Sequence, residues 1–214
     1  AFSLAPQVFR ALGAEVIAVN DEPNGVNINE NCVSTHPEAI CQVIKENNAQ
    51  LGFTFDGDAD RVLAVDEAGN LVDGDAIMTI LAMSLKEKGK LKNNAVVATV
   101  MSNLGLEKAA QAQGFKLLRT KVGDRYVLEE MLAGDYCVGG EQSGHIILLD
   151  YNTTGDGVLT ALQLAAVVAE QNKSLATLAS HFIRYPQVLI NCNVGTKEGW
   201  DTNIRIQQAI SEVE

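Results

Sequence analysis

Helical and strand-like patterns of hydrophobic residues alternate along most of the 214-residue chain. Apolar positions that recur every three or four residues predict helices, and short continuous apolar runs between turn residues predict buried strands. The predicted helices cover residues 4–12, 37–48, 76–88, 104–113, 124–133, 156–170, 174–183 and 204–213. The predicted strands cover residues 15–19, 51–55, 61–66, 96–100, 115–119, 136–140, 145–149 and 188–194.

This alternation predicts an α/β fold of two consecutive domains, each with a mixed, mostly parallel sheet flanked by helices. The pattern changes near Asp73 and again near Tyr185. We therefore expect domains at residues 1–73 and 74–184, followed by the start of a third unit at 185–214. Because the chain begins without Met and ends inside a helical pattern, we expect it to be a fragment, with the first and last units truncated.

Composition narrows the classes of function. The chain has 16 Lys and Arg against 27 Asp and Glu, a formal net charge of −11, and 47% hydrophobic residues. Such a composition excludes intrinsic disorder and argues against binding to nucleic acid or to an anionic membrane surface. No apolar run reaches the roughly 18–20 residues of a membrane span, and no signal peptide is recognisable. The widely spaced cysteines (Cys32, Cys41, Cys137 and Cys192) predict reduced thiols in a cytoplasmic protein.

The sharpest local motif is the acidic run DGDADR at residues 56–61, which lies between two predicted strands. Three carboxylates this close repel one another, and their hard oxygen atoms suit Mg²⁺ or Ca²⁺. Asp56, Asp58 and Asp60 are therefore candidate metal ligands. Arg61 either neutralises them or binds a phosphate beside the cation.

Three other interpretations of this run stay open. An EF-hand loop would place its ligands at Asp56, Asp58, Asp60 and Glu67, but Arg61 occupies the position that needs Gly, and strands rather than helices flank the loop. A phosphatase-type Asp-x-Asp nucleophile is a second interpretation. A solvated acidic turn without any ligand is the third.

Two further loops carry candidate binding groups. Residues 139–145, GGEQSGH, combine flexible glycines with Glu141, Ser143 and His145, a set that suits the hydroxyl groups of a sugar or an ordinary polar hairpin. Lys121 and Arg125 flank a predicted helix start and suit an anion, although Asp124 as a helix cap with two surface cations explains them equally well. Asp156 is expected to be a structural helix cap.

Taken together, these loops resemble the α-D-phosphohexomutase superfamily, most closely its bacterial phosphoglucosamine mutases. The resemblance rests on DGDADRV (56–62), KVGDRYV (121–127), GEQSGHI (140–146) and TTGDG (153–157), in that order, with EPNGVNIN (22–29) and VDGD (72–75) in support. It implies that the chain holds domain 2, domain 3 and the start of domain 4 of a four-domain enzyme. The catalytic phosphoserine of domain 1 and the phosphate-binding loop of domain 4 are absent from this sequence.

The resemblance also implies a function and its residues. The expected reaction interconverts glucosamine 6-phosphate and glucosamine 1-phosphate through a phosphoserine enzyme and a bisphosphate intermediate. Mg²⁺ would be held by Asp56, Asp58 and Asp60, Arg61 would steady the transferring phosphoryl group, and Glu141 and Ser143 would bind sugar hydroxyls. His145, Lys121 and Arg125 would lie near the substrate.

The general base is not identified. Some relatives carry a Lys after the first strand of domain 3, where this chain reads Val100-Met-Ser-Asn103, and His145 is a better candidate than Arg61. Expected partners are a phosphorylated amino sugar and domains 1 and 4 of the same chain, with a homodimer left open. The alternatives are a phosphomannomutase/phosphoglucomutase or a non-catalytic Ca²⁺ module. We expect the isolated chain to lack mutase activity and an ordered cation.

Overall fold

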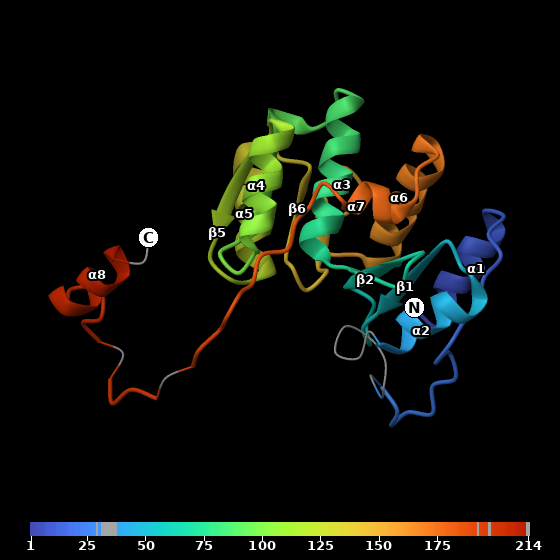
Figure 1. Ribbon diagram of the computed structural model, residues 1–214, viewed down its shortest axis with the longest axis horizontal. Coiled ribbons are helices and arrows are strands. Elements are labelled where there is room, and N and C mark those ends of the chain that lie inside the picture. The colour runs from blue at the N-terminus through green and yellow to red at the C-terminus, as the bar shows by residue number, and fades with distance from the viewer. Residues whose placement is uncertain (29, 31–37, 192, 197, 213–214) are drawn as a thin grey trace.

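The structure, a computed structural model, describes residues 1–28, 30, 38–191, 193–196 and 198–212. Two sheets lie side by side, with helices around them, and the last helix stands apart from this body (Figure 1). The α-helices are α1 Leu4–Ala11, α2 Glu38–Asn47, α3 Gly74–Glu87, α4 Leu104–Gln113, α5 Asp124–Gly134, α6 Gly157–Gln171, α7 Leu175–Ala179 and α8 Ile204–Ser211. A short 3₁₀ turn, Lys92–Asn94, precedes the second sheet.

The first sheet is antiparallel throughout its described pairs. Its strands are β1 Leu51–Phe55, β2 Val62–Asp66 and β3 Leu71–Val72, in that order. Helix α1 packs on it through Phe9, whose ring stacks on Phe53 with centroids 5.4 Å apart. Helix α2 packs on β1 and β2, and Ile44 fills the space above Gly52.

The second sheet is mixed, with strand order β5-β4-β6-β7. Strands β4 Ala95–Thr99, β5 Lys116–Thr120 and β6 Val138–Gly140 run parallel, whereas β7 Ile146–Leu148 pairs with β6 as an antiparallel hairpin. Successive side chains of a strand point to opposite faces, so Val96 and Ala98 join one core and Val97 joins another. Helix α5 covers the Val97 face, through Val127 and Met131.

One hydrophobic core connects the two sheets. Buried residues from β2, α3, β4, α4 and α6 form a single cluster, which includes Val62, Ile77, Val96, Leu106 and Leu164. Helix α3 lies at its centre and is buried on nearly all sides along its first nine residues. Two aspartates cap helices: Asp73 Oδ1 accepts the N–H of Ala76 at the start of α3, and Asp156 Oδ1, as expected, accepts that of Leu159 in α6.

The two-domain α/β class is confirmed, but three expectations differ from the structure. The expectation of mostly parallel sheets is wrong for the first sheet, where β1, β2 and β3 follow one another as hairpins. Residues 15–19 form no strand, and Ile17 and Val19 are 50% and 43% exposed. Residues 188–191 also form no strand, and Leu189 is 70% exposed. An apolar run becomes a strand only beside a partner strand, and neither run has one among the described residues.

Within the described ranges, no helix has the length and apolar character needed to cross a bilayer. Cys41 and Cys137 are free thiols, and burial raises the pKa of both. Cys32 and Cys192, also expected to be reduced, lie outside the described residues.

Candidate functional site

The acidic run forms the loop between strands β1 and β2. A strand on each side contradicts the EF-hand interpretation, which requires flanking helices. The start of α6 supports the loop from beneath, because the N–H of Gly157 donates to the carbonyl of Ala59 at 2.9 Å. A Cβ at residue 157 would lie 2.6 Å from the carbonyl oxygen of Arg61, so glycine permits this close approach.

The three aspartates of this loop converge. Oxygen atoms of Asp56, Asp58 and Asp60 lie within 4.8 Å of one another, with Asp58 exposed and the other two partly buried. Burial raises the pKa of Asp56 above its ordinary value, the N–H of Arg61 opposes this, and the charges of Asp60 and Asp58 raise it further. Oxygen-only ligands that repel one another in this way could hold a hard divalent cation.

Arg61 lies directly beside these carboxylates. Its backbone N–H donates to Asp56 Oδ1 at 3.2 Å, and its Nε lies 3.8 Å from Asp56 Oδ2 and 3.9 Å from Asp60 Oδ1. Because 47% of its side chain is exposed, the guanidinium has free donors facing solvent. Charge neutralisation and contact with a phosphate are therefore both within its reach.

The hairpin loop between β6 and β7 meets the acidic loop at His145. Arg61 and His145 form an antiparallel β-bridge, and the N–H of Val62 donates to the carbonyl of Gly144 at 3.1 Å. The ring of His145 is 4% exposed, with Nδ1 3.0 Å from Asp60 Oδ2. The structure thus joins two motifs that lie 85 residues apart in the sequence.

The hydrogen bonds of His145 assign its tautomer. The N–H of Gly155 donates to Nε2 at 3.2 Å, so this nitrogen is the acceptor. Nδ1 therefore carries the proton and donates it to Asp60 Oδ2. In this arrangement the neutral ring supports the acidic loop through its bond to Asp60. Asp124 Oδ2 lies 3.9 Å from Nε2.

Glu141 and Ser143 lie at the tip of the same hairpin loop. Ser143 is exposed, and its Oγ lies 3.5 Å from Glu141 Oε2. Glu141 Oε1 accepts the N–H of Gly123 at 3.3 Å, which connects this loop to the one that precedes α5. The arrangement leaves a hydroxyl and a carboxylate side by side, a pair that can accept and donate to neighbouring sugar hydroxyls.

The two candidate cations of the loop at residues 121–125 contact other side chains. Arg125 Nε pairs with Glu129 Oε1 at 2.8 Å on the surface of α5, with 82% of its side chain exposed. Lys121 Nζ lies 6.0 Å from the centre of the Tyr126 ring. Asp124, weighed as a helix cap, makes no capping bond at the start of α5. In this structure the loop approaches the hairpin through the Gly123 backbone and the Asp124 carboxylate rather than through Lys121 and Arg125.

Sequence reasoning missed two residues that support the site. A Cβ on Gly155 would lie 2.5 Å from the His145 ring, and one on Gly74 would lie 2.1 Å from the carbonyl oxygen of Glu141. Both glycines occur in quoted motifs, TTGDG and VDGD, but a glycine that yields space to a distant segment has no local signature.

Both parts of the chain match a known protein family. Residues 73–185 match the family model of phosphoglucomutase/phosphomannomutase alpha/beta/alpha domain III, and residues 1–69 match that of domain II. The chain belongs to the phosphoglucomutase/phosphomannomutase family. In this family context, the acidic loop lies in the part that matches domain II, and the hairpin loop lies in the part that matches domain III.

Individual relatives agree with this assignment. The chain is 55% identical over 216 residues to a phosphoglucosamine mutase of Alkaliphilus oremlandii (strain OhILAs), covering 100% of this chain and 48% of the relative. It is 62% identical over 192 residues to one of Thermoanaerobacter sp. (strain X514), covering 90% and 43%. The chain therefore spans about half the length of the curated relatives it matches.

A solved structure shows the same arrangement of elements. The phosphoglucomutase/phosphomannomutase family protein of Burkholderia thailandensis superposes with a TM-score of 0.74 at 25% identity, covering 87% of this chain and 40% of that one. The α/β architecture of the two sheets is therefore that of the family.

Proposed function

We propose that this chain is the metal-binding and sugar-binding part of a phosphoglucosamine mutase. The observation that carries the proposal is the contact between its two loops. The carboxylates of Asp56, Asp58 and Asp60 converge, and His145 bonds one of them to the hairpin that bears Glu141 and Ser143. Relatives that are 54–62% identical bear the name phosphoglucosamine mutase, which supports the amino sugar as substrate.

In this proposal the cation is Mg²⁺, and Asp56, Asp58 and Asp60 hold it. Their oxygen donors fit a hard divalent cation, which would also offset the mutual repulsion of the carboxylates; burial first, and then the charges of Asp60 and Asp58, raise the pKa of Asp56. When bound, Mg²⁺ supplies Lewis-acid stabilisation of charge on a transferring phosphoryl group. Arg61, with donors free beside the cluster, orients that phosphoryl group.

The hairpin loop binds the sugar. Glu141 accepts and Ser143 donates hydrogen bonds to ring hydroxyls, and these directional contacts align the hydroxyl that receives the phosphoryl group. His145 stands as a candidate base for the hydroxyl proton, while its bonds in this structure favour a role in holding Asp60. Lys121 and Arg125 would have to turn inward from their present positions to reach a substrate phosphate.

The remaining assignments follow the same proposal. Residues 1–73 and 74–184 correspond to domains 2 and 3 and residues 185–214 to the start of domain 4, with a phosphoserine supplied by domain 1. The enzyme is cytoplasmic, an assignment supported by the free thiols of Cys41 and Cys137. A phosphomannomutase/phosphoglucomutase is the second candidate, because the family model covers both activities.

Turnover of the full-length protein that contains this chain tests the proposal. We expect conversion of glucosamine 6-phosphate to glucosamine 1-phosphate, lowered at least about a hundredfold in Asp58→Asn and in Glu141→Gln. Glu170→Gln is the matched control, since it removes an exposed carboxylate of α6 that pairs with Lys88, outside the acidic and hairpin loops. Full activity in Asp58→Asn would contradict the assignment of the metal loop.

A further inference from the structure

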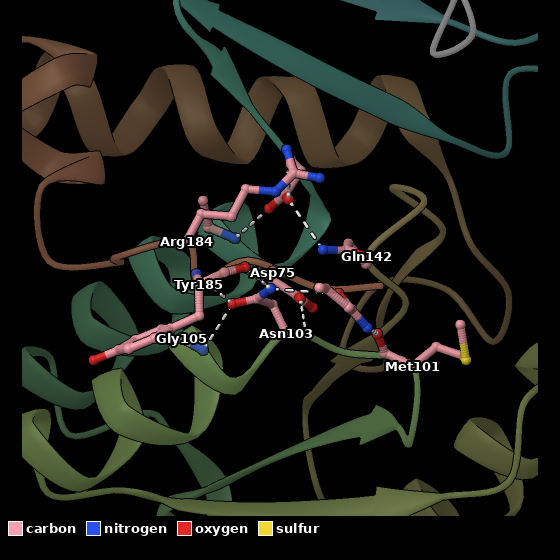
Figure 2. Close-up of polar contacts among 10 residues, drawn as sticks. Asp75, Met101, Asn103, Gly105, Gln142, Arg184 and Tyr185 are labelled. Atoms are coloured by element: carbon pink, nitrogen blue, oxygen red, sulfur yellow. Dashed lines mark hydrogen bonds and ion pairs between the residues drawn. The ribbon is translucent and has the colours of Figure 1, made fainter. Parts of the chain in front are cut away.

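A second polar cluster lies at the start of helix α3, away from the acidic loop. Figure 2 shows four segments meeting there: the first turn of α3, the loop after β4, the hairpin loop and the chain that follows α7. Asp75 of α3 is fully buried, and Asn103 after β4 is 1% exposed. Neither residue has a part in the proposed chemistry, so their burial needs a separate explanation.

The side-chain amide of Asn103 connects the start of α4 to residues 185–187 through both its oxygen and its nitrogen. Its Oδ1 caps α4 by accepting the N–H of Gly105, and it also accepts the N–H of Tyr185 at 2.9 Å. Its Nδ2 donates to the carbonyl of Tyr185 at 2.8 Å and to Gln187 Oε1 at 3.3 Å. The side-chain amide thus pairs with the Tyr185 backbone on both sides, as a neighbouring strand would.

Asp75 holds the backbone of Asn103 in place. Its Oδ2 accepts the backbone N–H of Asn103 at 2.7 Å, the short distance of a charge-assisted bond. A second contact holds the same segment, because Gln187 Nε2 donates to the carbonyl of Met101 at 2.9 Å. Close packing adds a third, since a Cβ on Gly105 would lie 2.1 Å from the carbonyl oxygen of Ile183.

Asp73 ties this segment to the hairpin loop. Its Oδ2 accepts a hydrogen bond from Gln142 Nε2 at 3.4 Å and lies 3.8 Å from Arg184 Nη1. The N–H of Gly74 also donates to the carbonyl of Gln142 at 3.0 Å. One helix start therefore holds both the loop that carries Glu141 and the segment that leads to residues 188–214.

We propose that Asn103 is a positioning residue that fixes residues 184–187, here called the linker, against the hairpin-bearing body. Past Gln187, the described residues of the chain make hydrogen bonds only to one another, and they extend away from the body (Figure 1). Asn103 thus sets the point and direction in which the following segment leaves. Its consequence for catalysis rests on the proposed function, because that segment would begin domain 4.

Hydrogen exchange of the linker amides in the 214-residue chain tests the proposal. Asn103→Ser keeps a capping oxygen for α4 but cannot reach Tyr185, so we expect the Tyr185 amide to exchange about tenfold faster. Asn103→Asp keeps both acceptor bonds but sets an oxygen in place of Nδ2 against the Tyr185 carbonyl and Gln187 Oε1, so we expect the Tyr185 amide to exchange faster than in the unsubstituted chain.

Asn93→Ser is the matched control. Asn93 Nδ2 also joins distant segments, donating to the carbonyls of Gly134 and Asp135, but does so far from the linker. We expect unchanged exchange at Tyr185 in this variant. Unchanged exchange in Asn103→Ser, or equal acceleration in both serine variants, would overturn the proposal. The readout needs no substrate, so it stands apart from the test of mutase activity.

Discussion

His145 donates a hydrogen bond from Nδ1 to Asp60 Oδ2 at 3.0 Å and thereby connects the hairpin loop to the acidic loop. The N–H of Gly155 occupies the other ring nitrogen. A buried, neutral imidazole that orients a carboxylate is a familiar support for a metal ligand. The contact explains why two loops from different parts of the sequence act as one site.

The first prediction concerns this contact. His145→Ala in the full-length protein should weaken Mg²⁺ binding about tenfold, because Asp60 loses the donor that orients it. His145→Asn can offer its amide nitrogen in place of Nδ1 and should recover part of that loss. Titration calorimetry measures both variants. Equal Mg²⁺ affinity in His145→Ala and the unsubstituted protein would contradict the positioning role.

The second prediction concerns the contribution of Asp58 to Mg²⁺ binding. In the full-length protein, Asp58→Asn should lower Mg²⁺ affinity at least about tenfold without loss of stability, since Asp58 is exposed and repelled by its neighbours. Glu170→Gln, which removes an exposed carboxylate paired with Lys88, should change neither quantity. Tight, Ca²⁺-selective binding by the 214-residue chain alone would instead support a calcium module.

The third prediction concerns Gly74. A Cβ at this position would lie 2.1 Å from the carbonyl oxygen of Glu141 and 2.9 Å from that of Gln142. Gly74→Ala should therefore displace the hairpin loop and lower the free energy of unfolding by about 1–3 kcal/mol. Gly195→Ala is the control, since nothing lies within 4 Å of its Cβ position. Urea denaturation compares the two, and equal midpoints would show that the loop does not press on residue 74.

The fourth prediction concerns pH. Burial raises the pKa of Asp75 to about 6 from an ordinary value of 3.8, against the opposing hydrogen bond from the backbone N–H of Asn103. The folded state then binds the proton more tightly than the unfolded state, so stability is greatest below pH 4 for this group and falls as pH rises through 6. A difference of about two pKa units corresponds to about 3 kcal/mol.

Asp75→Asn isolates this effect. The amide oxygen can still accept the N–H of Asn103, and the group no longer titrates. The free energy of unfolding of the unsubstituted chain, relative to Asp75→Asn, should therefore decline between pH 4 and pH 7 and change little above it. Urea titrations at each pH measure the difference. Parallel profiles for the two proteins would mean that Asp75 does not titrate in this range.

Much of the fold could be predicted from the sequence, because local patterns specify it. Helix α3 and strands β4 and β5 lie where apolar periodicity and turn residues indicated. The pattern failed at residues 15–19, where the apolar residues fit a strand but no described neighbour pairs with them. Pairing is a tertiary property, so a local run cannot reveal it.

For the site as well, local features could be predicted from the sequence and tertiary contacts could not. The three aspartates of residues 56–60 could be predicted as a cluster because they lie within five residues of one another. The link from His145 to Asp60 could not, because it depends on a bridge between segments 85 residues apart. The role of Arg125 stays a prediction, since its charge suits an anion site while its guanidinium pairs with Glu129 in this structure.

We propose that these loops serve a phosphorylated amino sugar. Measuring kcat/KM of the full-length protein for glucosamine 6-phosphate and for mannose 6-phosphate under the same conditions, with Mg²⁺ present, tests this proposal. We expect a clear preference for glucosamine 6-phosphate. A clear preference for mannose 6-phosphate would contradict it and assign the chain to a phosphomannomutase/phosphoglucomutase instead.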